Sequence, residues 1–548
     1  MKPANFLTLS ILIILIISCT KKQENKTSLT FLHTSGQYMV NENNDTILLR
    51  GVGLGNWLLP EGYMWHFGNS GDRPRKIEKI IEELTSPEFS DHFWKEFRLN
   101  YITEADIKKV AELGFNSVRP ALNARVFMTE GDTAIFIEEN FALLDSLIEW
   151  CGKYNIYVIL DMHGAPGGQT GQNIDDSPND EPELFMDQRN EERLMKLWIK
   201  LVDRYKDNPV VAGYDLLNEP LPERTGAAEK YKHLLEPMYK KLTAEIRKID
   251  KKHMIILEGY NWANNWSVFG EPFDDNLVYQ FHYYCWDNPD HLNDISYFLK
   301  ERDRLNVPVW VGETGERNIK IYFATTQYFE KNNIGWSYWP WKKIDNQQGI
   351  YSINAPDGYD KIIGYSNGEE KPPVEFAEQV LNQLLKNMKV ENCEFLESIS
   401  QSLFRQIPAM IYAVNYGHDG PGNSYQVNEN ENSKYYRTNE PVKIVMVQGK
   451  NGRRRNAEQA ISLSENEWTS YAFNSLKEFT GLVNIRARAV QLNSNIQISL
   501  NGDITPITLQ DTSWTNFEIR EQQFKIGENI LKAEVSNGGI LLVSFNIE

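Results

Sequence analysis

Two patterns of apolar and polar positions alternate along the chain up to about residue 400. Short runs of apolar and β-branched residues, typical of buried strands, are followed by stretches in which apolar residues recur every three or four positions, as on one face of a helix. The strand-like runs are 47–53, 115–120, 156–163, 210–219, 254–260, 277–284, 307–313 and 334–341. The helix-like stretches include 103–113, 138–154, 190–206, 229–249, 317–332 and 373–389.

Apolar strands that alternate with helices indicate a parallel sheet covered by those helices. Eight such units predict an α/β fold that closes into a (β/α)8 barrel rather than an open sheet. We expect this barrel domain to span 31–390.

The pattern changes past about residue 400. The segments 442–448, 468–473, 482–490, 495–500, 514–519 and 540–547 are short, often alternate between apolar and polar residues, and are separated by Gly, Asn and Asp. Short alternating strands of this kind predict a β-sandwich. We expect this second domain to span 405–548.

The N-terminus carries a short apolar run, FLTLSILIILII (6–17), which follows Lys2 and precedes Ser18 and Cys19. The run is too short for a membrane span and is typical of a signal peptide. Residues 16–19 (IISC) resemble a bacterial lipobox, in which the cysteine is lipidated and becomes the mature N-terminus. We therefore expect a signal peptide at 1–18, a polar tether at 19–30, and an extracytoplasmic lipoprotein of the outer membrane or cell surface. A plain secretory signal with an incidental cysteine is the alternative.

Composition narrows the class of protein. The chain has 548 residues, of which 41% are hydrophobic and 12% aromatic, so disorder is excluded as the main state. The net charge of −18 argues against a nucleic-acid partner, which requires a basic surface. Cys151, Cys285 and Cys393 lie far apart without a CxxC pair, so neither a disulfide framework nor a zinc site is predicted. We expect a monomer without metal or cofactor, in contact with a membrane only through the lipid anchor.

Polar or aromatic side chains stand at the ends of nearly all the predicted barrel strands. In barrels of this kind, chemistry gathers at the C-terminal ends of the strands. These ends read Arg119-Pro120, His163-Gly164, Asn218-Glu219, Glu258-Gly259, His282-Tyr283-Tyr284, Glu313-Thr314 and Trp339-Pro340-Trp341. A purely structural role would favour apolar or turn residues there, so the set predicts an active site.

Glu219 and Glu313 form the most informative pair in this set. Two opposed carboxylates, one a proton donor and one an ionised nucleophile, are what retaining glycoside hydrolysis needs. Taken alone, the stretch around Glu219 favours a solvated loop residue, and the other strand ends change that interpretation.

The neighbouring strand ends offer the supporting groups for this chemistry. Arg119 and His282 can hold the charge of the nucleophile, and Tyr284 can donate a hydrogen bond to it. Asn218 can bind the sugar 2-hydroxyl, a contact that strengthens in the transition state. Trp339 can form the floor under the reacting sugar ring.

Seven segments together resemble glycoside hydrolase family 5, in the order and at the spacing of that family, over roughly residues 31–390. They are GNWLLPE (55–61), FNSVRPALN (115–123), LDMHGAPGGQTG (160–171), LLNEP (216–220), FHYY (281–284), VGETG (311–315) and WSYWPWK (336–342). The resemblance implies that Glu219 is the acid/base and Glu313 the nucleophile. It also implies supporting places in the sugar subsite for Arg119, His163, Asn218, His282, Tyr284 and Trp339.

Within this family, RGVGLGNWLLPE and HGAPGGQTG look like segments of exo-β-1,3-glucanases. In those enzymes a glutamate and an aspartate close the blind end of the pocket. Glu61 matches the glutamate, and Asn173, Asp175 or Asp176 stands for the aspartate. Other branches of the family cut β-1,4-glucan, mannan or glycolipid glucosides.

These observations predict a retaining β-glycosidase that acts on an oligo- or polysaccharide, a β-glucan or related β-glucoside, with exo-β-1,3-glucanase action as one form. An endo-acting β-1,4-glucanase or mannanase, a transglycosylase and a non-enzymatic surface glycan-binding lipoprotein remain alternatives.

Several individual residues also keep two interpretations. Glu61 can be a solvated loop residue, and His163 and His282 can be core histidines. Trp262 and Trp266 can be outer stacking platforms or packing residues. The sandwich faintly resembles a family 6 carbohydrate-binding module at 407–425 and 511–519, with Trp514 as the stacking ring, or it is a scaffold.

Overall fold

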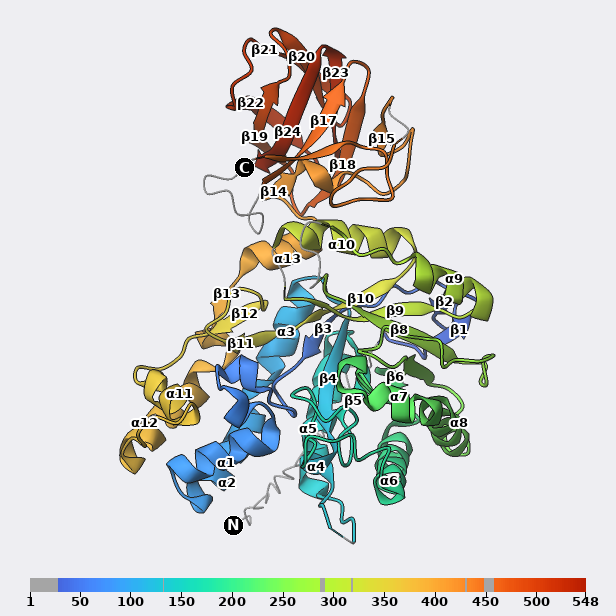
Figure 1. Cartoon of the computed structure of the whole chain (residues 1–548), viewed down its shortest axis with the longest axis vertical. Coiled ribbons are helices and arrows are strands. Elements are labelled where there is room, and N and C mark those ends of the chain that lie inside the picture. Colours follow the sequence, from blue (N-terminus) through green and yellow to red (C-terminus); the bar gives the residue numbers. More distant parts are fainter. Residues whose placement is uncertain (1–27, 132, 286–290, 317–318, 429–430, 448–457) are drawn as a thin grey trace, which may run out of the picture.

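The computed structural model describes residues 28–131, 133–285, 291–316, 319–428, 431–447 and 458–548. The expected signal peptide and Cys19 lie outside these ranges. Two parts lie end to end in Figure 1, an α/β part and an all-β part, with helix α10 (Ile319–Lys331) between them. Among the described residues, no helix combines the length and the apolar character that crossing a membrane requires.

Eight parallel strands close into a barrel, in the order β10-β3-β4-β5-β6-β7-β8-β9. They are β3 Arg50–Leu54, β4 Ser117–Asn123, β5 Tyr157–Gly164, β6 Val211–Asp215, β7 Met254–Glu258, β8 Leu277–Tyr283, β9 Val309–Gly315 and β10 Gly335–Trp339. Each lies in or overlaps one of the eight runs expected from the sequence. The prediction of a (β/α)8 barrel is therefore confirmed.

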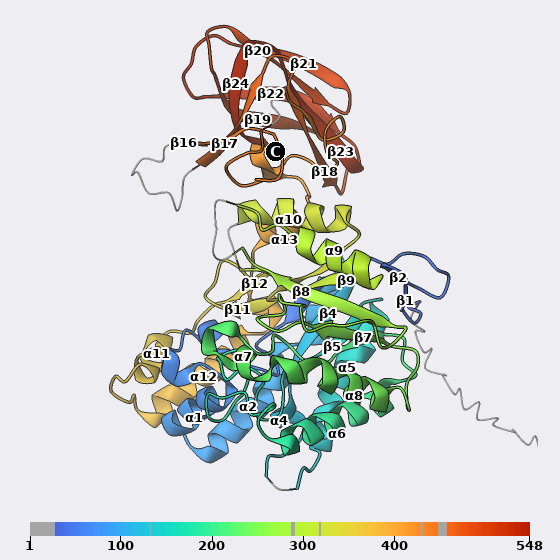
Figure 2. The ribbon, with the colours of Figure 1, turned by 45° about the vertical axis from the view of Figure 1, so that its right-hand side comes forward.

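Helices cover the outside of the barrel (Figure 2). They include α3 Glu104–Glu112, α5 Glu138–Lys153, α6 Gln188–Tyr205, α8 Leu235–Ile246, α9 Ser296–Leu305 and α12 Val374–Asn387. The single helix expected at 229–249 is wrong, because the segment divides into α7 Ala227–Tyr231, a 3₁₀ turn and α8. Pro237 lies in the first turn of α8, where its missing N–H is tolerated, whereas it would interrupt the middle of a longer helix.

The chain adds elements that the alternation does not predict. Helices α1 Pro74–Leu84 and α2 Pro87–Tyr101 form an insertion after β3, and each begins with a proline. The smaller additions are β1 His33–Ser35, β2 Tyr38–Val40, α4 Ala124–Phe127, β11 Lys342–Ile344, β12 Tyr351–Ile353, α11 Tyr359–Ser366, β13 Glu394–Phe395 and α13 Glu397–Leu403.

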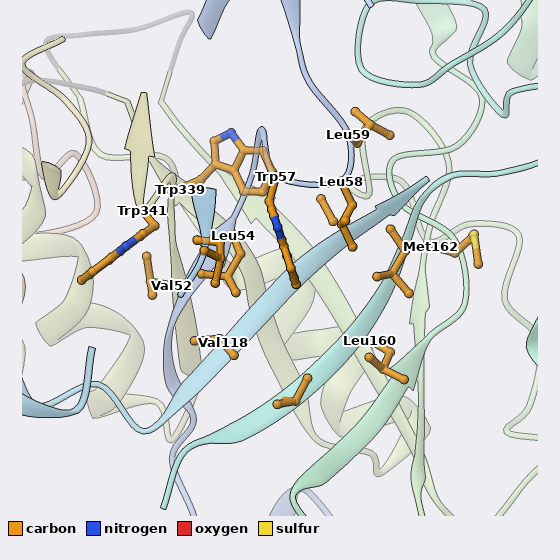
Figure 3. Close-up of a cluster of buried hydrophobic side chains, with 14 of the residues drawn as sticks. Val52, Leu54, Trp57, Leu58, Leu59, Val118, Leu160, Met162, Trp339 and Trp341 are labelled. Carbon is orange, nitrogen blue, oxygen red and sulfur yellow. The ribbon is translucent and has the colours of Figure 1, made fainter. Parts of the chain in front are cut away.

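Alternate residues of each strand face the barrel interior and the surrounding helices. In β5, Leu160 and Met162 belong to the large apolar cluster shown in part in Figure 3. Ile159 belongs to a separate apolar cluster, and Asp161 and His163 follow it at the same two-residue spacing. The interior is therefore apolar near the start of the strand and charged near its end, where the site lies.

The C-terminal part contains two antiparallel sheets, ordered β16-β17-β24-β19-β22, with β14 also on β24, and β15-β18-β23-β20-β21. The strands are β14 Ala409–Tyr412, β15 Tyr425–Gln426, β16 Ile444–Val447, β17 Glu458–Ser464, β18 Trp468–Ser475, β19 Phe479–Ala489, β20 Ser494–Leu500, β21 Asp503–Leu509, β22 Thr515–Phe524, β23 Gly527–Asn537 and β24 Gly539–Ile547. The all-β prediction is confirmed. The sequence did not indicate β14, β15, β17, β21 or β23.

Candidate active site

Most of the predicted site residues stand at the C-terminal ends of barrel strands. Arg119 is in β4, His163 in β5, His282 in β8, Glu313 in β9 and Trp339 in β10. Tyr284 follows β8 directly. The strand ends therefore bring these six side chains to one end of the barrel.

Asn218 and Glu219 lie in a loop, because β6 ends at Asp215 and not at residue 219 as the sequence suggested. Main-chain hydrogen bonds hold this loop: the N–H of Asn218 donates to the carbonyl of Met162 at 3.0 Å. The main-chain N–H of Glu219 donates to Oε2 of Glu258 at 2.6 Å. Glu219 itself has a φ of +43°, a left-handed conformation that is uncommon for a residue with a side chain.

The two candidate catalytic carboxylates face each other. One oxygen of Glu219 and one of Glu313 lie within 4.8 Å of each other, and both lie within that distance of a ring nitrogen of His282. Glu219 is 9% exposed and Glu313 is 4% exposed. Both line a cavity of about 690 Å³, together with Glu61, Tyr63, His163, Asn173, Arg224, Trp262, His282, Tyr284, Cys285, Asn293, Glu316 and Trp339, among others.

Glu313 is held by two charge-stabilising donors. Nη1 of Arg119 lies 2.7 Å from Oε1, and the hydroxyl of Tyr284 donates to Oε2 at 2.7 Å. Burial and the neighbouring Glu313 raise the pKa of Tyr284 well above its usual value, so the phenol keeps its proton and remains a donor. The two contacts hold both carboxylate oxygens of Glu313 in place.

Arg119 is completely buried and serves several acids at once. Besides Glu313 it lies 3.2 Å from Asp161, 2.8 Å from Asp215 and 3.0 Å from Glu258. At Asp161, Asp215 and Glu258, burial raises the pKa more than the charge of Arg119 lowers it. The pKa of Asp215 rises to about 6, and those of Asp161 and Glu258 are also raised. Removal of this guanidinium would leave buried carboxylates without a counter-charge, which is strongly destabilising.

Sequence reasoning missed Asp161, Asp215 and Gln280 and left Glu258 outside the catalytic set. Gln280 donates to Oε1 of Glu258 at 2.8 Å. The two-residue periodicity of strands could have revealed two of them. Asp161 and Gln280 each precede a histidine of the site by two residues, so they share its inward face.

His163 and Asn218 orient each other. Burial lowers the pKa of His163 to about 4, so its ring is neutral at neutral pH. Nδ1–H then donates to Asp161 at 2.7 Å, and Nε2 accepts from Nδ2 of Asn218 at 3.2 Å. Oδ1 of Asn218 accepts from Arg119 at 2.9 Å, which fixes the direction of the amide.

Glu219 and His282 form a tight pair. Nδ1 of His282 lies 2.6 Å from Oε1 of Glu219 and 3.5 Å from Oε2 of Glu313, so this histidine serves the first glutamate more directly than the second. Burial lowers the pKa of His282, but the charges of Glu313, Glu258 and Glu219 together raise it well above its usual value. Burial raises the pKa of Glu219, and the charge of His282 outweighs that effect and lowers it.

Trp339 forms a flat wall of the cavity. Its ring lies parallel to that of His163, with 5.2 Å between ring centroids and 2° between ring planes. Its Nε1 donates to the hydroxyl of Tyr63 at 3.0 Å. A Cβ atom at Gly53 would lie 2.3 Å from this ring, and one at Gly55 would lie 2.5 Å from it, which explains the last two glycines of GVGLG.

Glu61 lies on the cavity wall and is 2% exposed. Its Oε1 has no hydrogen-bond partner among the described residues. Burial, and then the charges of Glu313 and Glu316, raise its pKa well above the usual value. A solvated loop position is therefore excluded for this side chain.

The three candidates in the loop after β5 have different surroundings. Asp175 accepts hydrogen bonds from Thr170 within the loop, and Asp176 pairs with Arg75 and Arg125. Asn173 lines the cavity. The loop thus presents an amide at this wall, where the resemblance implied an aspartate.

The two tryptophans after β7 have separate roles. Trp266 is completely buried and donates through Nε1 to the carbonyl of Gln280 at 3.1 Å, so it is a packing residue. Trp262 lines the cavity, and the guanidinium carbon of Arg224 lies 4.9 Å from its ring centroid. Glu316 also lines the cavity and pairs with Lys343 at 2.5 Å.

A parallel barrel with two facing carboxylates and a flat aromatic wall at its C-terminal end has the features of a glycoside hydrolase. The family model described as cellulase (glycosyl hydrolase family 5) matches residues 80–345, which include both glutamates. The chain therefore carries a catalytic domain of glycoside hydrolase family 5.

Curated relatives match parts of the chain. A β-xylosidase of Phanerodontia chrysosporium is 27% identical over 60% of this chain and 74% of that protein. Endoglucanase C of Acetivibrio thermocellus is 31% identical over 35% of this chain and 53% of that protein. A sporulation-specific glucan 1,3-β-glucosidase of Saccharomyces cerevisiae is 26% identical over 50% of this chain and 65% of that protein. The chain thus spans just over half of the endoglucanase and about two thirds of the glucan 1,3-β-glucosidase.

Proposed function

We propose that this protein is a retaining β-glycosidase that hydrolyses a β-glucan or a related β-glucoside. The observation that carries the proposal is the approach of Glu219 and Glu313 to within 4.8 Å between carboxylate oxygens. Retaining enzymes hold their two carboxyl groups about 5–5.5 Å apart, whereas inverting enzymes leave about 6.5–9.5 Å for a water molecule. The relatives named as a glucosidase and an endoglucanase support a glucan as substrate.

In the first step, a carboxylate oxygen of Glu313 attacks the anomeric carbon. The bond from that carbon to the glycosidic oxygen breaks, and the leaving oxygen takes a proton from Glu219. In the second step, water attacks the anomeric carbon of the glycosyl ester, gives its proton to Glu219 and releases Glu313 as a carboxylate. Atoms, charge and protons return to their starting state after each turnover.

The Glu219–His282 pair supplies the proton: Glu219 takes the proton of the imidazolium, 2.6 Å away, as it protonates the leaving oxygen, and it returns a proton to His282 after the second step. Before the first step, the imidazolium and the two carboxylates carry a net charge of −1. Transfer of one proton to the leaving oxygen makes the pair one unit more negative, and formation of the glycosyl ester neutralises Glu313. The net charge of the three side chains is therefore the same before and after the step, which avoids creating an extra charge in a buried site.

A His282→Asn substitution is expected to move the basic limb of the pH profile of kcat/KM to lower pH by about one unit or more. The pKa of His282 is raised well above its usual value, so the pair keeps its proton to a higher pH than a free imidazole would. Without the imidazole, the proton must reside on the carboxyl of Glu219, which loses it at lower pH. Initial rates across the pH range measure the shift.

The matched control is His253→Asn, which alters another buried histidine. His253 lies next to Asp250, just before β7 starts, at the opposite end of the barrel from the cavity. This variant is expected to keep the wild-type pH profile. If the basic limb of the His282→Asn profile stays at the wild-type pH, the Glu219–His282 pair does not hold the catalytic proton.

The residues around the cavity are compatible with exo action and with endo action, and one observation supports each. Glu61 is buried, and one of its oxygens has no partner in the described part of the chain, which suits the closed end of an exo-acting pocket. A second cavity of about 700 Å³ shares Tyr63 and Asn173 with the first, which favours a longer cleft and endo action. Exo-β-1,3-glucanase and endo-glucanase or mannanase action are thus the two candidates for specificity.

The sugars released from β-1,3-glucan, β-1,4-glucan, mannan and an aryl β-glucoside by residues 20–548 test the function. Glucose alone from β-1,3-glucan supports the exo form, and longer oligosaccharides support the endo form. Products longer than the substrate identify a transglycosylase. Binding without release from any of these substrates would overturn the glycosidase proposal in favour of a glycan-binding protein.

We also propose that the protein is an extracytoplasmic lipoprotein anchored through Cys19 at the outer membrane or cell surface and that it acts as a monomer. Support comes from the apolar run and the IISC sequence at residues 16–19. Mass spectrometry of the mature N-terminus distinguishes a diacylated Cys19 from an unmodified secreted end. Light scattering of the soluble form measures its oligomeric state.

A further inference from the structure

The C-terminal domain contacts the barrel through helix α10, which follows the strand of Glu313. Figures 1 and 2 show this helix facing the sandwich. Phe323 and Ala324 of α10 belong to the apolar cluster of the sandwich rather than to that of the barrel. Polar contacts flank them: Lys320 donates to Gln459 at 2.6 Å, and Arg405 pairs with Glu330 at 2.8 Å. The interface is therefore continuous with the sandwich core.

Two buried residues of the sandwich join two barrel segments. The hydroxyl of Tyr436 donates to Oδ1 of Asn415 at 2.8 Å. Nδ2 of Asn415 donates to the main-chain carbonyl of Lys320 in the first turn of α10 at 2.7 Å. The main-chain carbonyl of Tyr436 accepts from the N–H of Leu292, in the segment between β8 and α9, at 2.6 Å. Tyr436 is 2% exposed and Asn415 is 1% exposed.

The segment around Leu292 includes a residue that lines the cavity. Its neighbour Asn293 lines the cavity, accepts through its carbonyl from the hydroxyl of Tyr283 at 2.9 Å, and donates through its N–H to Sγ of Cys285. Tyr283 and Cys285 flank Tyr284, the donor to Oε2 of Glu313. On the other side, α10 begins four residues after Gly315, the last residue of β9.

We propose that Tyr436 and Asn415 are positioning residues for the nucleophile. The sandwich thereby helps to hold the active site in its geometry without lining the cavity. The pair ties the segment that flanks Tyr284 to the helix that follows Glu313, and thereby fixes the donor and the carboxylate relative to each other. The proposal rests on the role of Glu313 as nucleophile. It assigns to the C-terminal domain a function in catalysis that does not require it to bind sugar.

The surroundings of Trp514 favour this function over sugar binding at that residue. The guanidinium carbons of Arg486 and Arg488 each lie 5.3 Å from the centroid of its ring. Two cations at this distance compete with a sugar for stacking on the ring.

Tyr436→Phe is the first test, in the full chain. It removes only the hydroxyl that bonds Asn415. We expect kcat on an aryl β-glucoside to fall about tenfold with little change in KM, because small displacements of reacting groups are costly in rate. Asn415→Asp, which keeps the acceptor for Tyr436 but loses the donor to Lys320, is expected to lower kcat similarly. The double variant is expected to lose less than the product of the two single losses, because both act through one connection.

Tyr471→Phe is the matched control. Tyr471 is also buried in the sandwich, and its hydroxyl donates to the main-chain carbonyl of Ala413 at 2.9 Å. Its loss is expected to lower the melting temperature to a similar extent while kcat stays at the wild-type value. Equal kcat in wild type, Tyr436→Phe and Asn415→Asp would overturn the proposal. A wild type that is inactive in the same assay would instead overturn the proposed function.

Discussion

Replacing Glu313 with Gln is expected to reduce kcat by at least about 10⁴-fold on every substrate, because the amide cannot form the glycosyl ester. The side chain keeps its size, and its one amide oxygen can still accept from Arg119, whose present bond to Oε1 of Glu313 is 2.7 Å long. The amide nitrogen then replaces Oε2 and can donate to the hydroxyl of Tyr284. The fold and the binding of substrate are therefore expected to persist. Initial rates and isothermal titration with a glucan oligosaccharide measure the two effects separately.

Glu330→Gln is the control for the loss of a buried, arginine-paired carboxylate. Glu330 lies on α10 and pairs with Arg50 at 2.7 Å and Arg405 at 2.8 Å, away from the cavity. This variant is expected to unfold at a lower denaturant concentration and to keep its kcat. Residual activity of Glu313→Gln above a tenth of the wild-type value would rule out this glutamate as the nucleophile.

Replacing Glu219 with Gln is expected to reduce kcat on glucan by about 10²–10⁴-fold, the usual contribution of a general acid. The loss depends on the leaving group. A dinitrophenyl glucoside needs little protonation, so its first step is expected to proceed almost normally, and the glycosyl ester of Glu313 then accumulates for lack of a base. A burst of dinitrophenolate followed by slow turnover is the expected time course.

Azide offers an internal check on this second variant. A small anion that needs no base can replace water in the second step, so added azide is expected to accelerate turnover and to yield a β-glycosyl azide. Equal losses on glucan and on the dinitrophenyl glucoside, without a burst and without acceleration by azide, would contradict the acid/base role of Glu219.

The sequence was sufficient to predict the barrel strands and the residues that gather at their ends. Apolar β-branched runs report burial on both faces, and all eight expected runs correspond to barrel strands. The position of Glu219 was less accurate, since β6 ends at Asp215 and the left-handed turn at Glu219 continues the chain as a loop. A hydrophobic run continues through LLNEP without revealing that the hydrogen-bond ladder has ended.

The charge cluster behind the site was harder to predict, because its members come from separate strands. Asp161 and Asp215 look like isolated acids in the sequence, and only closure of the barrel brings them to Arg119. In the sandwich, β17 and β23 carry polar side chains at alternate, partly exposed positions. Such segments differ little from polar loops when pairing with neighbouring strands is unknown.

Arg119 also links the assembly of the site to the assembly of the fold. Its guanidinium, on β4, meets acids from β5, β6, β7 and β9, so five of the eight strands converge on one cation. A barrel that lacks one of these strands would bury the cation with fewer acids, or the acids without the cation, and either state is electrostatically unfavourable. Partly closed barrels are thereby selected against, and a chain that has acquired its catalytic geometry has also completed its fold.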